Sequence, residues 1–182
     1  MILRYKIFSA AECRKIIEQL GDKMLQNMTV KTKRGYRVNK NSLDVLVSYH
    51  RRSKKTGWIY DRMDEFFFRA VRRFRFDVKG TTEPLKYLVY NKGQHINRWH
   101  TDSRLYEPAA SKLTRKLSMS IELSPRGSFE GGKLEVFQSG PPLNARQGWA
   151  VVFPSHVPHR LIPVTQGVRH VLVNFFSGPP FR

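Results

Sequence analysis

Two stretches in the first 80 residues have the apolar spacing of amphipathic helices. In the first, Ser9 and Glu12 are spaced as a capping box, in which each side chain accepts a hydrogen bond from the other residue's backbone amide. This pattern predicts a helix over 9–25. The second helix is predicted over 58–74, and its aromatic stripe is expected in the core rather than on a base-stacking surface. The expected core positions are Cys13, Ile16, Ile17, Leu20 and Met24, followed by Ile59, Met63, Phe66, Phe67, Ala70 and Phe74.

Beyond Gly80 the apolar periodicity changes from helical to short, strand-like runs separated by Gly, Pro and Asn. Two further segments precede it: a weakly alternating one at 2–8, either a strand or a lead-in, and a strand candidate at 43–49. Short strands at this spacing are typical of a β-sandwich or jelly roll. Gly131 and Gly132 indicate a tight turn near the mouth of a pocket. The strands are predicted at 84–90, 96–100, 117–123, 133–137, 149–153, 159–162 and 170–176.

The length of 182 residues suits one domain with a single core, and 40% of the residues are hydrophobic. No apolar run approaches the ~18 residues of a membrane span, and the segment at 1–8 is too short and too charged for a signal peptide. The single cysteine, Cys13, excludes an internal disulfide framework and fits a reducing compartment. We therefore expect a cytoplasmic protein with no membrane contact, whose oligomeric state the pattern does not determine.

Charge is the unusual feature of the composition, with 33 Lys and Arg against 14 Asp and Glu and a net charge of +19. The basic residues cluster at 31–40, 51–55 and 69–79, and breakers within the first cluster favour a mobile loop. Such a field attracts polyanions, acidic protein surfaces or anionic small molecules. No nucleic-acid-binding motif accompanies it, so a nucleic-acid partner and a merely solvated basic face both stay open.

Four polar residues in the strand-rich half have the types and spacing of a metal site. His100 and Asp102 are two positions apart in an extended segment, so their side chains are expected on the same side. His159 begins a later strand, and Arg169 follows ten residues further on inside an apolar run. A buried arginine requires an anion, which a ligand can supply. Two histidines and one carboxylate are the donors of the facial triad that binds non-haem Fe(II) and leaves positions open.

The sequence around these residues closely resembles the Fe(II)/2-oxoglutarate-dependent dioxygenases of the prolyl 4-hydroxylase type, especially their small bacterial and phage branch. The resemblance covers about residues 82–182. It implies an α+β, mainly β protein, with a double-stranded β-helix (jelly roll) core at 82–182 supported by a helical, basic segment at 1–81, all within a single domain at 1–182. The segments that carry it are 90–102, 115–124, 129–137 and 149–178, the last containing Phe-Pro-Ser…His-Arg…Pro-Val-Thr-x-Gly-x-Arg, and the closing Gly-Pro-Pro-Phe-Arg.

The same resemblance assigns roles to individual residues. His100, Asp102 and His159 take the three iron positions. The far carboxylate of 2-oxoglutarate needs a cation, which Arg169 supplies as a bidentate fork. Tyr90 lies where related enzymes place a tyrosine that contacts this co-substrate.

Related enzymes often place another tyrosine on the strand matching 117–123, and this sequence departs from them there. Ser118 or Ser120 is expected to replace that second hydroxyl contact. Phe175 also stands where a tryptophan is common, which is expected to change packing more than chemistry. No catalytic residue is expected beyond the metal ligands.

The implied reaction is the oxidative decarboxylation of 2-oxoglutarate to succinate and CO2, coupled to hydroxylation of a substrate C–H bond by O2, with ascorbate as an optional cofactor. A protein or peptide is the expected substrate, and proline is favoured by analogy alone. Two alternatives stay open. One is a 2-oxoglutarate oxygenase acting on nucleic acid, and the other is a non-catalytic jelly-roll module that only binds a partner.

Overall fold

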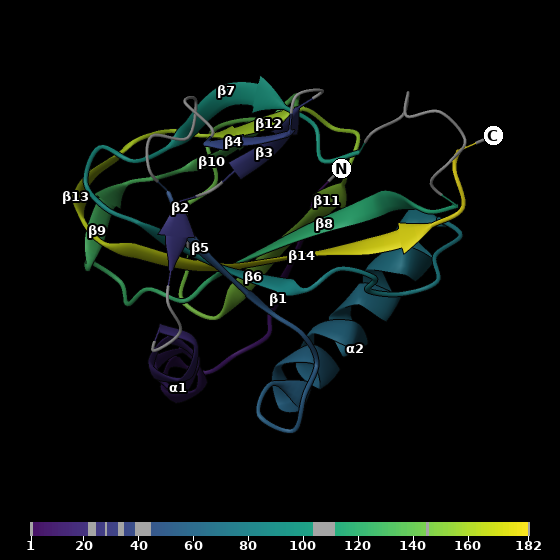
Figure 1. Ribbon diagram of the computed structural model, residues 1–182, viewed down its shortest axis with the longest axis horizontal. Coiled ribbons are helices and arrows are strands. Elements are labelled where there is room, and N and C mark those ends of the chain that lie inside the picture. Colours follow the sequence, from purple (N-terminus) through teal and green to yellow (C-terminus); the bar gives the residue numbers. More distant parts are fainter. Residues whose placement is uncertain are drawn as a thin grey trace.

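The computed structural model describes residues 2–21, 25–27, 29–32, 35–38, 45–103, 112–144 and 146–181. Its largest element is a seven-stranded antiparallel sheet of order β1-β11-β8-β14-β6-β5-β2, which runs across the middle of the molecule (Figure 1). The strands are β1 (Leu3–Lys6), β11 (Trp149–Pro154), β8 (Thr114–Glu122), β14 (Arg169–Gly178), β6 (Leu85–Tyr90), β5 (Leu46–His50) and β2 (Gln26–Asn27).

Helices α1 (Ala10–Gly21) and α2 (Gly57–Phe74) cover one face of this sheet (Figure 1). The capping box is present, because the Ser9 amide donates to Glu12 and the Glu12 amide donates to the Ser9 hydroxyl. The expected core faces are largely buried, with Cys13 fully buried. Apolar side chains from both layers pack between helices and sheet, among them Ile16, Leu20, Met63 and Phe67 of the helices and Met119, Ile121, Val152 and Leu172 of the sheet.

A second layer lies over the opposite face of the large sheet. It contains a three-stranded sheet of order β10-β12-β7 and a β13-β9 pair. The two layers enclose the inner space of a double-stranded β-helix, the predicted core architecture, and this fold prediction is confirmed. These strands are β7 (Ile96–His100), β9 (Phe129–Gly131), β10 (Leu134–Val136), β12 (His159–Leu161) and β13 (Val164–Gly167).

The register of the large sheet determines which polar side chains face the inner space. On β8 these are Ser118, Ser120 and Glu122, which alternate with the buried apolar residues that face the helices. Ser118 pairs with Phe175 of β14, and Glu122 pairs with Val171. Strand β8, an interior strand of this sheet, therefore carries a line of three polar side chains toward the inner space.

Several boundaries differ from the sequence prediction. The helix predicted over 9–25 is described as α1 from Ala10 to Gly21, and residues 22–24, with the expected core position Met24, lie outside the described residues. The segment at 31–40 was expected to be a loop, but β3 (Thr29–Thr32) and β4 (Gly35–Val38) pair there as an antiparallel ribbon. The strands β9 and β13 were not predicted, because each has only three or four residues and is half exposed. Residues 43 and 44 of the strand predicted at 43–49 lie outside the described residues.

Within the described ranges, neither helix combines the length and the hydropathy that crossing a membrane would require.

Candidate metal centre and adjoining cavity

His100, Asp102 and His159 lie together at one end of the inner space. Each offers one donor atom, and these atoms are all within 4.8 Å of one another. His100 ends β7 and His159 begins the neighbouring strand β12, where the two residues are register partners. Asp102 follows β7 and is held by its backbone amide, which donates to the Ser155 carbonyl at 2.9 Å. The end of β7 and the start of β12 thus bring two imidazoles and a carboxylate to one point.

Both imidazoles are oriented in the same way. The Nδ1 atom of His100 is 3.1 Å from the Arg98 carbonyl, and that of His159 is 3.1 Å from the Val157 carbonyl. A carbonyl only accepts, so each Nδ1 carries a proton, and in the neutral ring Nε2 keeps the lone pair that can bind a metal. This second hydrogen bond is the usual support of a metal-binding histidine. The donor set therefore fits a divalent first-row metal such as Fe(II).

The Asp102 carboxylate is held by its neighbours. Its Oδ2 accepts a hydrogen bond of 2.7 Å from the Ser118 hydroxyl, which is also 2.9 Å from the Ser155 hydroxyl. Its Oδ2 lies 3.3 Å from His159 Nε2. Burial alone would raise the pKa of Asp102, but the contacts with His159 and Ser118 outweigh it and lower that pKa. The carboxylate is therefore ionised, as a metal ligand must be.

Arg169 is buried at the start of β14, with 4% of its surface exposed. Its Nε donates to Glu122 Oε2 at 2.8 Å, and both side chains are at most 5% exposed. The sequence predicted that this arginine needs an anion and considered a ligand, but Glu122 supplies one from within the chain. The sequence pattern assigned no role to Glu122. The alternation of side chains along a strand could have indicated this partner, because Glu122 lies four residues after Ser118 and therefore on the same face of the strand.

Aromatic rings and a glycine shape the space around Arg169. Its guanidinium carbon lies 5.6 Å from the ring centre of Tyr90 and 5.8 Å from that of Phe129. Tyr90 is its register partner on β6, and burial raises the pKa of Tyr90 to about 12. Gly132, in the predicted Gly131-Gly132 turn, has a positive φ of 56°, and a Cβ there would lie 3.1 Å from the Arg169 Cδ. A larger residue would press on the arginine.

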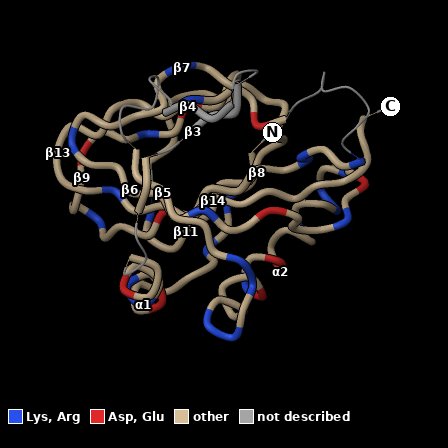
Figure 2. The backbone as a smooth tube through the Cα atoms, viewed as in Figure 1, with Lys and Arg blue, Asp and Glu red and all other residues tan. Residues whose placement is uncertain are grey.

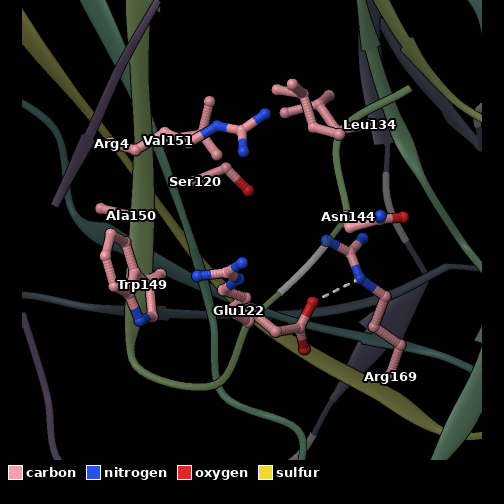
Figure 3. Close-up of a pocket in the computed structure, with 11 residues that line it drawn as sticks. Arg4, Ser120, Glu122, Leu134, Asn144, Trp149, Ala150, Val151 and Arg169 are labelled. Carbon is pink, nitrogen blue, oxygen red and sulfur yellow. Dashed lines mark hydrogen bonds and ion pairs between the residues drawn. The ribbon is translucent and has the colours of Figure 1, made fainter. Parts of the chain in front are cut away.

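A cavity of about 200 Å³ lies beside this ion pair. Figure 3 shows the Glu122–Arg169 contact on one side, with the end of the guanidinium turned into the space, and Arg4 and Val151 on the other. Ser120 points into the cavity between them. The lining is Arg4, Ser120, Glu122, Leu134, Leu143, Asn144, Arg146, Trp149, Ala150, Val151 and Arg169.

The structure separates the sequence-predicted residues into two groups. Ser118 lies beside the metal ligands and donates to Asp102, whereas Ser120 lines the cavity. Tyr90 contacts Arg169 but is not among the cavity-lining residues. The other four histidines lie outside the candidate metal-ligand group: His50 near Ser48, His95 near Asn97, His156 between Phe76 and Phe181, and His170 on Tyr87.

Known proteins resemble the chain in sequence. No protein-family model matches it. A PKHD-type hydroxylase of Hyphomonas neptunium is 32% identical over 133 residues, covering 69% of this chain and 57% of the relative. Another from Sphingopyxis alaskensis is 32% identical over 91 residues, covering 49% and 41%. The chain thus spans about half the length of these curated relatives.

Solved structures resemble it in fold. A viral collagen prolyl hydroxylase from Paramecium Bursaria Chlorella virus-1, in its 2OG complex, matches with a TM-score of 0.72 at 14% identity, over 97% of this chain and 96% of that one. A prolyl-4-hydroxylase from Pseudomonas putida matches with a TM-score of 0.70 at 15% identity, over 97% and 92%.

A prolyl hydroxylase from Trichoplax adhaerens, in complex with a hypoxia inducible factor peptide fragment, matches with a TM-score of 0.73 at 12% identity, over 96% and 82%. The resemblance found in the sequence is confirmed by the curated relatives and by the shared fold.

Proposed function

We propose that this chain, a homologue of the PKHD-type hydroxylases with the fold of the 2OG-Fe(II) oxygenases, is an Fe(II)- and 2-oxoglutarate-dependent dioxygenase. The observation that carries the proposal is the convergence of the donor atoms of His100, Asp102 and His159 within 4.8 Å of one another. Strand β8 connects this group, through Ser118, with the cavity lined by Ser120 and Arg169. When bound, Fe(II) and 2-oxoglutarate supply the oxidation of a substrate C–H bond by O2, with succinate and CO2 as by-products.

The spacing along β8 supports the placement of the co-substrate. Ser118 touches the metal-ligand carboxylate, Ser120 lines the cavity, and Glu122 touches Arg169. Residues in a strand rise ~3.3 Å each, so the two ends of this line are about 13 Å apart. Side chains reach inward from both ends, and a five-carbon dicarboxylate fits the remaining gap. Arg169 would bind its far carboxylate, and Tyr90 and Ser120 would contribute hydroxyl groups.

The proposed substrate is a protein or peptide, with proline as the favoured residue. Three structural neighbours are prolyl hydroxylases, and one of them is bound to a peptide fragment. Incubation of candidate peptides with Fe(II), 2-oxoglutarate, O2 and ascorbate, followed by mass spectrometry, should show the addition of one oxygen atom. A cytoplasmic location is part of the proposal, because a reducing compartment retains ferrous iron and leaves Cys13 as a thiol.

The test of the metal and co-substrate roles is an anaerobic titration. Adding 2-oxoglutarate to the Fe(II)-loaded protein should produce a visible absorption band, which a non-catalytic jelly-roll module would not show. His159→Ala should abolish the band, because it removes one of three metal donors. Arg169→Ala should keep the iron but weaken 2-oxoglutarate binding about tenfold or more, because it removes a charge-assisted hydrogen bond to the distal carboxylate. Unchanged co-substrate affinity in Arg169→Ala would overturn the role of Arg169.

A nucleic-acid substrate is the second candidate, and the net charge of +19 favours it. The active-site chemistry would be the same. A hydroxylated base or sugar in place of a hydroxylated peptide would establish it.

A further inference from the structure

Both oxygens of the buried Glu122 carboxylate are held. Oε1 accepts a hydrogen bond of 3.0 Å from the Ser124 amide, and Oε2 accepts one of 2.8 Å from Arg169 Nε. The side chain is 4% exposed and extends from the end of β8, an interior strand of the large sheet. A carboxylate fixed at both oxygens has one orientation, and it transfers that orientation to whatever it binds.

The consequence for Arg169 is directional. A guanidinium presents its donors along separate edges, and Glu122 occupies the Nε side. Among the described residues, none forms a hydrogen bond with the Nη groups, which turn into the cavity (Figure 3). The Tyr90 and Phe129 rings flank the guanidinium, and Gly132 leaves room for its stem. The fork is thus oriented before any ligand arrives.

We propose that Glu122 is the positioning residue that makes this cavity specific for a ligand with a distal carboxylate. It holds the Nε side of Arg169 in place. The Nη groups of the guanidinium are then a preformed pair of donors for the ligand carboxylate. This inference rests on the proposed function, because it concerns the site at which 2-oxoglutarate would bind. Preorganisation of this kind raises affinity by removing the cost of ordering the arginine at the moment of binding.

The charge of Glu122 alone does not account for its position. A carboxylate beside Arg169 compensates the buried charge of the arginine when no ligand is bound, but it also cancels part of the charge that attracts an anionic ligand. Orientation is the benefit that offsets this loss. A variant that keeps the hydrogen-bond acceptor but removes the charge separates these two effects. It should keep Arg169 oriented while no longer cancelling its charge.

The experiment measures 2-oxoglutarate affinity by anaerobic titration of the Fe(II)-loaded protein, alongside bound iron. Glu122→Ala removes the hold on Arg169 and should weaken binding about tenfold or more. Glu122→Gln keeps one oxygen, which can accept from Arg169 Nε when its NH2 group replaces the oxygen that faces the Ser124 amide. With the Nε contact kept, this variant should bind 2-oxoglutarate within about threefold of the parent, or more tightly. The matched control is Glu135→Ala, which removes the carboxylate partner of Arg160 at a site outside the cavity. It should change neither affinity nor iron content.

Two comparisons separate positioning from general damage. 2-Oxobutyrate lacks the distal carboxylate, so Glu122→Ala should bind it as the parent does. In the Arg169→Ala background, Glu122→Ala should cause no further loss of 2-oxoglutarate affinity, because a residue that acts through Arg169 has nothing left to position.

Each result decides the proposal. It is overturned if folded Glu122→Ala binds 2-oxoglutarate as the parent does, if the losses with Arg169→Ala add, or if 2-oxobutyrate binding falls equally. Should Glu122→Ala fail to fold, Glu122→Gln decides, since a tenfold loss in that variant contradicts a role carried by the contact with Arg169 Nε. If Arg169→Ala itself leaves 2-oxoglutarate binding unchanged, the proposed role of the arginine has failed, independently of Glu122.

Discussion

At the scale of single residues, Ser118 and Ser120 look interchangeable in the sequence but occupy different environments. Both point from β8 into the inner space, two positions apart. Ser118 donates to the Asp102 carboxylate at 2.7 Å, whereas Ser120 lines the cavity. The sequence assigned the two serines one shared role as a co-substrate hydroxyl. The geometry instead ties the first to a metal ligand and leaves the second next to the proposed co-substrate.

Ser118→Ala should weaken iron binding about 10- to 100-fold, because loss of an outer hydrogen bond leaves the carboxylate free to turn away. Ser120→Ala is the matched control, with the same chemical change one inward position along the strand. It should leave iron affinity unchanged and reduce only 2-oxoglutarate affinity. Competition with a chelator of known affinity measures the first quantity. Equal iron affinity in both variants would contradict the role of Ser118.

Cys13 gives a residue-scale prediction that depends on burial. Burial raises the pKa of its thiol to about 11, above the usual value for a cysteine. A raised pKa means that the folded state keeps the proton, so its contribution to stability is present below about pH 9 and is lost as pH rises toward 11. At pH 8 we expect Cys13 to react with a thiol reagent only after unfolding. Rapid labelling of the native protein would contradict this.

At the scale of secondary-structure elements, the sequence predicted both helices and the main strands because each follows a local period. Helix α2 begins within one residue of its predicted start and ends where predicted. The capping box at Ser9 and Glu12 also needed only neighbouring residues. The Arg169–Glu122 pair could not be predicted from local sequence patterns, because it joins residues 47 positions apart through the register of β14 with β8. Register depends on the whole sheet, which no local pattern encodes.

Strand β1 adds a residue to the cavity from outside the β-helix. It pairs with β11, so that Arg4 lies opposite Val151 and lines the cavity. Because Glu122 neutralises much of the charge of Arg169, the field at the cavity mouth depends more on Arg4 and Arg146. The expected role of the segment at 1–81 was support, and β1 extends that role to the cavity wall.

Arg4→Gln should lower 2-oxoglutarate affinity about twofold to fivefold, the size of effect expected for an exposed charge, and the loss should shrink as salt is added. Lys6→Gln is the control, because this substitution also removes one positive charge. Lys6 lies two residues further along the same strand and does not line the cavity. Equal losses in the two variants would mean that only net charge matters.

At the scale of the whole molecule, acidic side chains neutralise part of the excess positive charge among the described residues. On α2, Arg62 pairs with Glu12 and Arg69 pairs with Glu65, while Arg52 contacts two aspartates of the same helix. Figure 2 shows basic residues concentrated in the segment between β5 and α2. They lie near the helices, on the side of the large sheet opposite the metal ligands (Figures 1 and 2). A substrate bound at the metal centre need not contact them.

This arrangement predicts how the protein treats nucleic acid. A net charge of +19 should give measurable binding to duplex DNA at low salt. The DNA affinity should fall steeply between 50 and 200 mM salt, with a slope that increases with the number of phosphates contacted. Hydroxylation of a proline peptide should proceed at the same rate with and without the duplex at ~150 mM salt, because the basic segment and the metal centre lie on different sides of the sheet. Strong inhibition that persists at that salt concentration, or an oxygen atom added to the DNA, would instead place nucleic acid at the active site and make it the substrate.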